Sequence, residues 1–84
     1  MTQEEVFDVL KKHILDQLED EVEEDQIDIE KSMLDLGANS LDIVEIVTNT
    51  MRELKIKIPR DELAGINTMK GLVAAMTEYK SKSN

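Results

Sequence analysis

The sequence has no cysteine and no tryptophan, and its 84 residues include one proline, three glycines, one phenylalanine and one tyrosine. The missing cysteine excludes a disulfide framework, a thiolate metal site and a thiol nucleophile. Because aromatic residues make up only 2% of the chain, the core has to be built from leucine, isoleucine, valine and methionine. The length suffices for one small domain with a modest core.

Long hydrophobic runs are also missing. No apolar stretch approaches the length of a membrane-spanning helix, and no signal-peptide pattern precedes the first predicted helix, so we expect a cytoplasmic protein with no membrane partner. The formal net charge of −9 opposes binding to nucleic acid and favours partners with basic surfaces. This charge is uneven: residues 1–45 contain 15 acidic and 3 basic side chains, whereas residues 46–84 contain 4 acidic and 7 basic ones.

Helical periodicity predicts an all-α domain of four helices. The predicted helices cover residues 3–18, 40–54, 59–65 and 68–79. Thr2 and Glu5 have the spacing of a capping box, which fixes the start of the first helix. Pro59 fits the first position of the short third helix, and Asn67 or Thr68 can cap the fourth.

The segment between the first two helices is long and acidic. Residues 19–25, EDEVEED, repel one another and predict a solvated loop, and they lack the glycine of an EF-hand calcium loop, so no metal site is predicted. The apolar residues expected to bring the loop back over the core are Ile27, Ile29, Met33, Leu34 and Leu36. We expect residues 1–79 to form a single helical domain and residues 80–84 to be a disordered tail.

The second predicted helix has more apolar surface than an inward-facing stripe needs. The residues expected to face the core are Ile43, Ile46, Val47, Thr50 and Leu54. Leu41, Val44 and Met51 lie about a third of a turn further round. If this second group is buried, the helix is deeply embedded; if it is exposed, it forms an apolar strip whose acidic rim, Asp42 and Glu45, suits a basic partner.

Ser40 begins this helix directly after a turn predicted at Gly37. An ordinary N-cap is one explanation for a serine at this position. No catalytic residue is predicted, because the single histidine, His13, is a surface residue of the first helix with no visible partner and the G-x-S-x-G elbow is absent. If Ser40 is instead the point at which a group is covalently attached, it needs no neighbouring base in this chain. A phosphodiester on Ser40 would be favoured by the free amides at the helix start.

The stretch DLGANSLDIVEIV, residues 35–47, resembles the signature of acyl carrier proteins, in which Gly-x-Asp-Ser-Leu places 4′-phosphopantetheine from coenzyme A on the serine. The likeness extends over about residues 3–79 and includes the isoleucine-proline step at residues 58–59. It implies a four-helix acyl-carrier-like bundle with a long first loop, a short third helix and no catalysis of its own. Such a protein holds acyl groups as thioesters on a flexible arm and presents them to successive enzymes.

The resemblance implies that Ser40 carries 4′-phosphopantetheine and that partner enzymes read the helix that follows it. The recognition face predicted from the resemblance and the apolar strip together consists of Asn39, Leu41, Asp42, Val44, Glu45, Thr48 and Met51. The expected partners are a phosphopantetheinyl transferase and acyl-processing enzymes such as a ketosynthase and an acyltransferase. A monomer is expected.

Three residues depart from the family pattern. Asn39 stands where the family usually has aspartate, which removes a charge that the transferase commonly meets; modification is still expected. Thr48 and Arg52 fall where fatty-acid carriers usually have an apolar and an acidic residue. With the basic balance after residue 45, these departures favour a stand-alone carrier of a polyketide pathway over fatty-acid biosynthesis. An aminoacyl or peptidyl carrier, and a helical interaction module in which Ser40 is a simple cap, are the alternatives.

Overall fold

The first helix, α1, forms as its capping sequence predicts. In this computed structural model, which describes residues 1–82, α1 covers Gln3–Leu18. The Glu5 amide donates to Oγ1 of Thr2 over 3.2 Å, and the Thr2 amide donates to Oε1 of Glu5 over 2.9 Å. The hydrogen bond from the Thr2 amide, together with one from its hydroxyl, lowers the pKa of the Glu5 carboxyl. The predicted capping box and helix bounds are confirmed.

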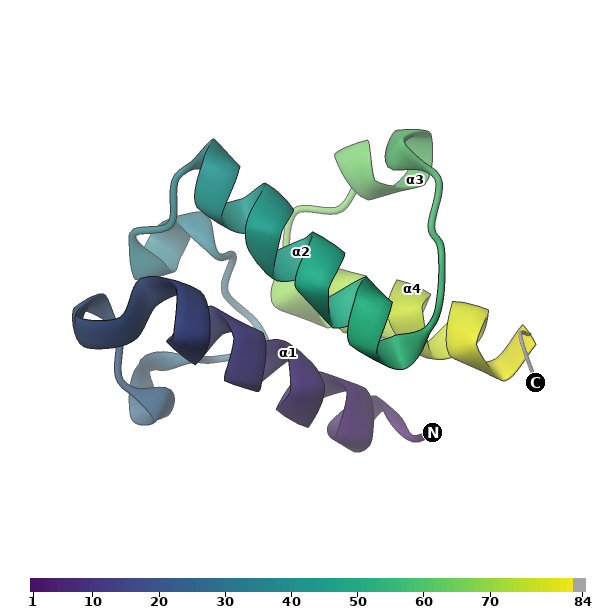
Figure 1. The fold of residues 1–84 in the computed structure, drawn as a ribbon, viewed down its shortest axis with the longest axis horizontal. Coiled ribbons are helices and arrows are strands. Elements are labelled where there is room, and N and C mark those ends of the chain that lie inside the picture. The colour runs from purple at the N-terminus through teal and green to yellow at the C-terminus, as the bar shows by residue number, and fades with distance from the viewer. Residues whose placement is uncertain (83–84) are drawn as a thin grey trace.

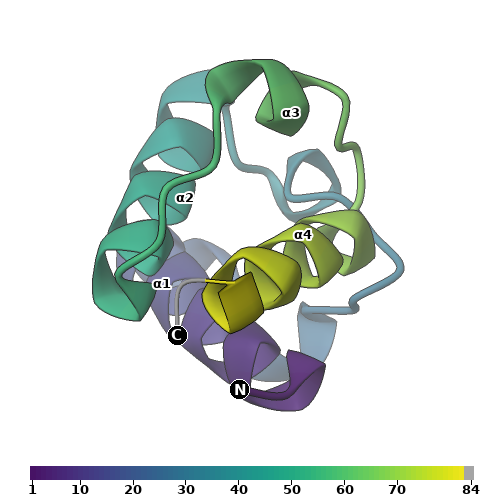
Figure 2. The ribbon, with the colours of Figure 1, turned by 90° about the vertical axis from the view of Figure 1, so that its right-hand side faces the viewer.

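Three further helices complete an all-helical bundle. They are α2 (Ser40–Leu54), α3 (Arg60–Ala64) and α4 (Met69–Lys82). α1 packs against both α2 and α4, and the short α3 lies on the other side of α2 and α4, away from α1 (Figure 1, Figure 2). Residues 1–82 contain no strand. None of the helices described in this range combines the length and the apolar content of a membrane span. The predicted four-helix fold is confirmed.

The core lies between α1, α2 and α4, and it is aliphatic, as the low aromatic content requires. The buried residues of these helices are Val6, Leu10, Ile14, Leu18, Ile46, Val47, Thr50, Leu54, Met69, Leu72, Val73 and Met76. Thr50, the polar member of this set, donates its hydroxyl to the carbonyl of Ile46 over 2.7 Å, so its burial leaves no unpaired donor. The predicted inward face of α2 is confirmed, with Ile43 half-buried at its edge.

The connector from α2 to α3 is extended, and one of its sides is buried. Ile56 and Ile58 are buried, whereas the lysines that alternate with them are exposed. Pro59 precedes α3 as its N-cap, so the prediction that it fills the first helical position was wrong by one residue. The extended backbone of Pro59, with ψ of 143°, is the reason: helical geometry begins only after it. α3 ends at Gly65, as predicted.

A side-chain hydrogen bond ties α3 to α4. The Tyr79 hydroxyl donates to Oε2 of Glu62 over 2.5 Å. This hydrogen bond to a carboxylate raises the pKa of Tyr79 above its ordinary value, because ionising the phenol would both break the bond and add a second negative charge. The contact holds the short α3 beside the longer helix.

The last helix is longer than the sequence indicated. Thr68 caps α4, since its Oγ1 accepts a hydrogen bond from the Gly71 amide over 3.1 Å. The helix then continues to Lys82, so residues 80–82 of the expected disordered tail are helical; residues 83 and 84 lie outside the described part of the chain. Lys82 forms an ion pair with Glu78 one turn earlier, over 3.3 Å, and its charge suits the negative end of the helix.

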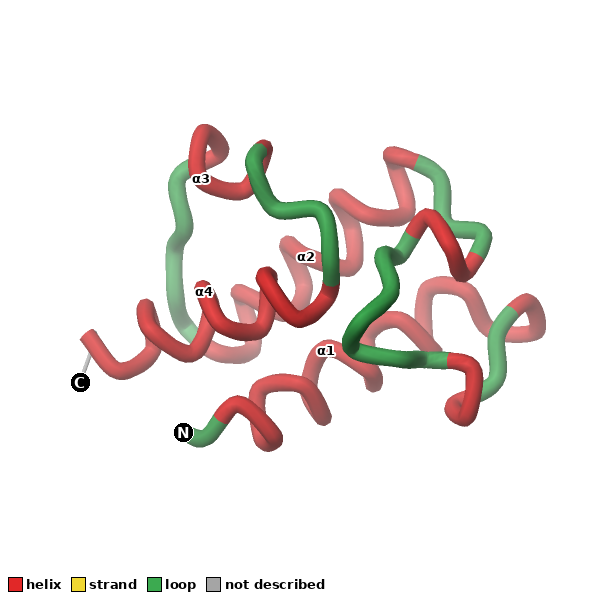
Figure 3. The backbone as a smooth tube through the Cα atoms, turned by 180° about the vertical axis from the view of Figure 1, so that it is seen from behind, coloured by secondary structure: helices red, strands yellow, loops and turns green. Residues whose placement is uncertain are grey.

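The loop between α1 and α2 crosses the end of the bundle (Figure 3). It contains short 3-10 turns at Glu19–Glu21, Glu24–Gln26 and Leu34–Leu36. Ile27 and Met33 are buried as predicted, and Val22 is buried too, so the acidic run is anchored by its one apolar residue instead of being fully solvated. Leu34 is 63% exposed, and its predicted packing on the core was wrong. The turn that begins at Leu34 directs its side chain outward after the buried Met33.

The loop is also fastened to the start of α4 through its backbone. The amide of Met69 donates to the carbonyl of Lys31 over 2.9 Å, and the amide of Lys70 donates to the carbonyl of Ile29 over 2.8 Å. Amides in the first turn of a helix have no partner within that helix. The loop carbonyls therefore satisfy groups that would otherwise need water.

Candidate functional site

A turn at Gly37 directs the chain into α2. Gly37 has φ of +93°, a left-handed conformation that glycine adopts without strain. The amides of Gly37 and Ala38 donate to the carbonyls of Leu34 and Met33, over 3.0 Å and 3.2 Å. The Ala38 side chain is buried, so the turn is anchored to the core just before the helix starts.

Asn39, and not Ser40, is the N-cap of α2. Oδ1 of Asn39 accepts a hydrogen bond from the Asp42 amide over 2.9 Å, and the Asn39 amide donates to Oδ2 of Asp42 over 3.2 Å. Ser40 is the first residue inside the helix. The interpretation of Ser40 as an ordinary cap is therefore wrong, because Asn39 already pairs with the amide that a cap must satisfy.

The Ser40 side chain is exposed, and nothing in the described part of the chain engages its hydroxyl by a hydrogen bond. The amides of Ser40 and Leu41 belong to the first turn of α2, where a helix supplies no acceptor, and within residues 1–82 neither makes a hydrogen bond. These N–H groups and the positive end of α2 favour an anion beside the hydroxyl. The residues present therefore fit a phosphodiester on Oγ of Ser40.

The apolar strip predicted on α2 is exposed at two of its three residues. Leu41 is 77% exposed and Val44 is 58% exposed, which excludes a deeply embedded helix. Met51 is half-buried and lines a cavity instead of extending the strip. From here on, the apolar strip means Leu41 and Val44.

The two acidic residues at the rim of the strip differ in their surroundings. Asp42 is half-buried; besides its hydrogen bonds with Asn39, it accepts one from Nε2 of Gln17 on α1 over 3.2 Å. Glu45 is exposed, and within residues 1–82 it makes neither an ion pair nor a hydrogen bond through its side chain. Glu45 is therefore the carboxylate that a partner can reach without disturbing the fold.

The single histidine lies far from Ser40. Nε2 of His13 is 2.9 Å from Oε1 of Glu53, and Nζ of Lys12 is 2.5 Å from the same oxygen. Hydrogen bonds from Lys12 and then from His13 lower the pKa of Glu53. Glu53 lies thirteen residues after Ser40 on α2, which is about 20 Å at the rise of an α-helix. His13 is 15% exposed and has a partner, so the expectation of an unpartnered surface residue was wrong.

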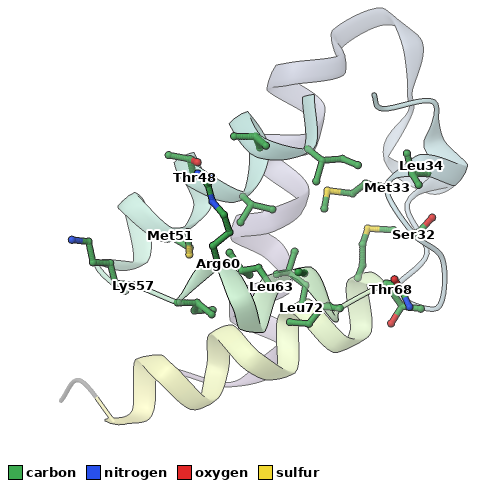
Figure 4. Close-up of a pocket in the computed structure, with 18 residues that line it drawn as sticks. Ser32, Met33, Leu34, Thr48, Met51, Lys57, Arg60, Leu63, Thr68 and Leu72 are labelled. Atoms are coloured by element: carbon green, nitrogen blue, oxygen red, sulfur yellow. The ribbon is translucent and has the colours of Figure 1, made fainter. Parts of the chain in front are cut away.

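A cavity of about 670 Å³ opens between α2, α3 and the long loop, with the start of α4 completing its wall (Figure 4). Val44, one helical turn from Ser40, contributes to its lining, and Thr48 and Met51 follow on α2. Leu63 lines it from α3. A cavity of this size is within the range of small-ligand sites. Sequence reasoning missed it, because the distance between α2 and α3 follows from tertiary packing and no local spacing encodes it.

Comparison with known proteins identifies the family. Residues 8–76 match the family model described as "Phosphopantetheine attachment site". The chain is 41% identical over 78 residues to a protein named "Acyl carrier protein" of Clostridium perfringens strain SM101, a match that covers 92% of this chain and 100% of the relative. It is 35% identical over 69 residues to the "Polyketide biosynthesis acyl-carrier-protein AcpK" of Bacillus subtilis strain 168, covering 82% of this chain and 83% of that relative.

The family match begins inside α1, runs through α2 and α3 and ends inside α4, so it includes the turn, the exposed serine and the cavity described above. The chain therefore belongs to the acyl carrier protein family, whose cofactor is covalently attached 4′-phosphopantetheine.

Proposed function

We propose that Ser40 carries the 4′-phosphopantetheine of this carrier and that the protein, acting as a monomer and without catalysis of its own, presents the attached acyl intermediates to biosynthetic enzymes. One observation supports this assignment above the others. The Ser40 hydroxyl is exposed at the first turn of α2 and is left free because Asn39 provides the cap. Attachment therefore costs the helix none of its own hydrogen bonds.

This chain supplies the hydroxyl that accepts the phosphopantetheine and the amides around it. The modifying enzyme has to supply the base that removes the hydroxyl proton. During attachment, Oγ of Ser40 loses its proton and forms a bond to phosphorus, while adenosine 3′,5′-bisphosphate leaves coenzyme A. The unpaired amides of Ser40 and Leu41 stabilise the negative phosphodiester that results. Once bound, the arm supplies the thiol that forms the thioester with the acyl group.

The proposed recognition face surrounds this serine. Its exposed members on α2 are Leu41, Val44, Glu45 and Thr48, joined by the exposed Asn39 and by the half-buried Asp42 and Met51. The apolar strip gives a partner a surface to bury, and Glu45 gives it a carboxylate to pair with. The partners proposed for this face are a phosphopantetheinyl transferase, a ketosynthase and an acyltransferase.

Reversing the charge of Glu45 is expected to weaken recognition without unfolding the protein. In Glu45→Lys, kcat/KM for phosphopantetheine attachment should fall roughly tenfold, because a rim charge that steers and holds a basic partner becomes repulsive. Initial rates of modification at several carrier concentrations measure this ratio. The matched control is Asp16→Lys, which makes the same charge change on an exposed position of α1. Equal ratios for the two variants would contradict the proposed face.

For the pathway we propose polyketide biosynthesis, with fatty-acid biosynthesis as the second candidate. Thr48 and Arg52 are both exposed on α2, where a partner docking along this helix would meet them. The resemblance between this chain and the polyketide carrier of Bacillus subtilis supports the first candidate. The higher identity to the Clostridium perfringens protein, named simply "Acyl carrier protein", is the reason for keeping the second.

A direct comparison of partner enzymes tests the pathway. The modified protein would be offered, in separate reactions, to an acyltransferase and ketosynthase from fatty-acid synthesis and to a pair from a polyketide system. We expect kcat/KM at least about tenfold higher with the polyketide pair, a difference of roughly 1.4 kcal/mol. A preference of the same size for the fatty-acid pair would overturn the assignment.

A further inference from the structure

The cavity beside α2 differs in charge from the rest of the molecule. The chain as a whole has a net charge of −9. The two charged residues that line the cavity, Lys57 and Arg60, are both basic, and no aspartate or glutamate belongs to the lining. A pocket whose charged groups are all cationic, in a chain so rich in carboxylates, favours an anionic ligand group.

Arg60 is the better placed of the two cations. Its side chain rises from the first residue of α3 toward Thr48 on α2, whereas Lys57 points away from the cavity (Figure 4). None of the ion pairs formed within residues 1–82 includes Arg60. Glu62, two residues further along α3, already accepts the Tyr79 hydroxyl. The guanidinium of Arg60 is therefore available to a group that enters from outside.

The remaining lining is suited to a hydrocarbon chain. Val47 and Met51 of α2 face Leu63 of α3 across the cavity. Val44 joins the lining one turn after Ser40, and Thr48 follows one turn later, so the position of Thr48 is about 12 Å along the helix axis from the serine. A chain that enters beside Val44 thus meets apolar walls first and then, further along α2, the Arg60 guanidinium at the exposed side of the cavity.

We propose that this cavity takes acyl groups that carry a second carboxylate at their far end, and that Arg60 binds that carboxylate. The proposal rests on Ser40 as the attachment site, since the acyl chain has to enter from that end of α2. A guanidinium presents parallel N–H donors that match the two oxygens of a carboxylate. Because Arg60 is exposed, solvent screens the pair and its contribution is modest, but it separates a carboxylated acyl group from a neutral one of equal length.

The test compares two loaded forms of the protein. Adipoyl and hexanoyl phosphopantetheine would be transferred to Ser40 from the corresponding acyl-coenzyme A; both acyl groups have six carbons, and they differ in ending with a carboxylate or a methyl group. Intact mass confirms loading before anything else is measured. We expect Tm of the adipoyl form to exceed that of the hexanoyl form by roughly 1–5 °C. We also expect adipoyl-specific changes in the amide NMR shifts of Thr48 and Arg60.

Arg60→Gln should abolish both differences. Arg52→Gln is the matched control, because it removes the same charge from an exposed position on α2 that does not line the cavity; it should retain both differences. Equal Tm values and shifts for the two loaded forms of the parent, or a difference that persists in Arg60→Gln, would overturn the assignment of the carboxylate site. A parent that gains no mass would instead overturn the proposed function, so the two failures are distinguishable.

Discussion

Replacing Ser40 with alanine is expected to abolish phosphopantetheine attachment while leaving the fold intact. The parent should gain the mass of one phosphopantetheine when it is incubated with coenzyme A and a broad-specificity transferase, and Ser40→Ala should gain none. Oγ of Ser40 is the acceptor proposed here, and no neighbouring hydroxyl occupies the first turn of α2. Intact-mass spectrometry of the two proteins is the measurement.

The stability of Ser40→Ala distinguishes a serine that only carries the cofactor from a serine that also caps the helix. Because Asn39 is the cap, Ser40→Ala should change the free energy of unfolding by no more than about 0.5 kcal/mol. A true cap would lose about 1 kcal/mol on the same change. Ser81→Ala, at an exposed serine of α4, is the control for modification and should gain mass like the parent. Continued modification of Ser40→Ala would contradict the assignment of Ser40.

Ile46→Ala is expected to produce the largest loss of stability. Ile46 is fully buried on the face of α2 that packs against the core. Truncating a buried isoleucine to alanine removes apolar burial and leaves a cavity, which costs about 2–5 kcal/mol. That loss is a large share of the roughly 5–15 kcal/mol that stabilises a small domain. Urea unfolding followed by far-ultraviolet circular dichroism measures it.

Val44→Ala provides the comparison for this loss. Val44 is on the same helix, two residues earlier, and is also β-branched, but its side chain is 58% exposed. The free energy of unfolding should change by no more than about 0.5 kcal/mol, since little buried surface is removed and alanine favours the helix. Similar losses in the two variants would show that α2 does not pack on the face that includes Ile46.

The ends of the two longest helices could be predicted because their signals are local. Thr2 and Glu5 specify the start of α1 through a reciprocal pair of hydrogen bonds between residues three apart. Gly37 supplies the turn that α2 needs immediately before its cap. Helical spacing also identified Leu41 and Val44 as lying outside the inward face of α2, but it left open whether they are buried, and the structure shows both exposed.

The bounds of α2 were predicted correctly, but the cap was sought at Ser40 instead of Asn39, although the sequence contained the signal. Asn39 and Asp42 have the same three-residue spacing as Thr2 and Glu5, and they form the same reciprocal hydrogen bonds. Serine and asparagine are both good caps, so propensity could not choose between neighbours. The residue three positions after the cap could have decided between them. A cap at Asn39 places the carboxylate of Asp42 at the third helical position, whereas a cap at Ser40 places no carboxylate there.

Other features depend on residues far apart in the chain. His13 has Glu53 as its partner, forty residues later, and nothing near His13 in the sequence indicates this. The burial of Val22 amid carboxylates depends on where the long loop crosses the bundle. The cavity likewise needs the separation of α2 and α3, which the connector and the Tyr79 hydrogen bond set together. Local sequence patterns do not encode these long-range contacts.

The hydrogen bond between Tyr79 and Glu62 also makes the single tyrosine an intrinsic spectroscopic probe. The chain has one tyrosine and no tryptophan, so its intrinsic fluorescence at tyrosine wavelengths arises from a single ring. That ring is held against α3, the five-residue helix that forms one wall of the cavity. Its emission and absorbance therefore report on the contact between α3 and α4, without a dye or an added residue.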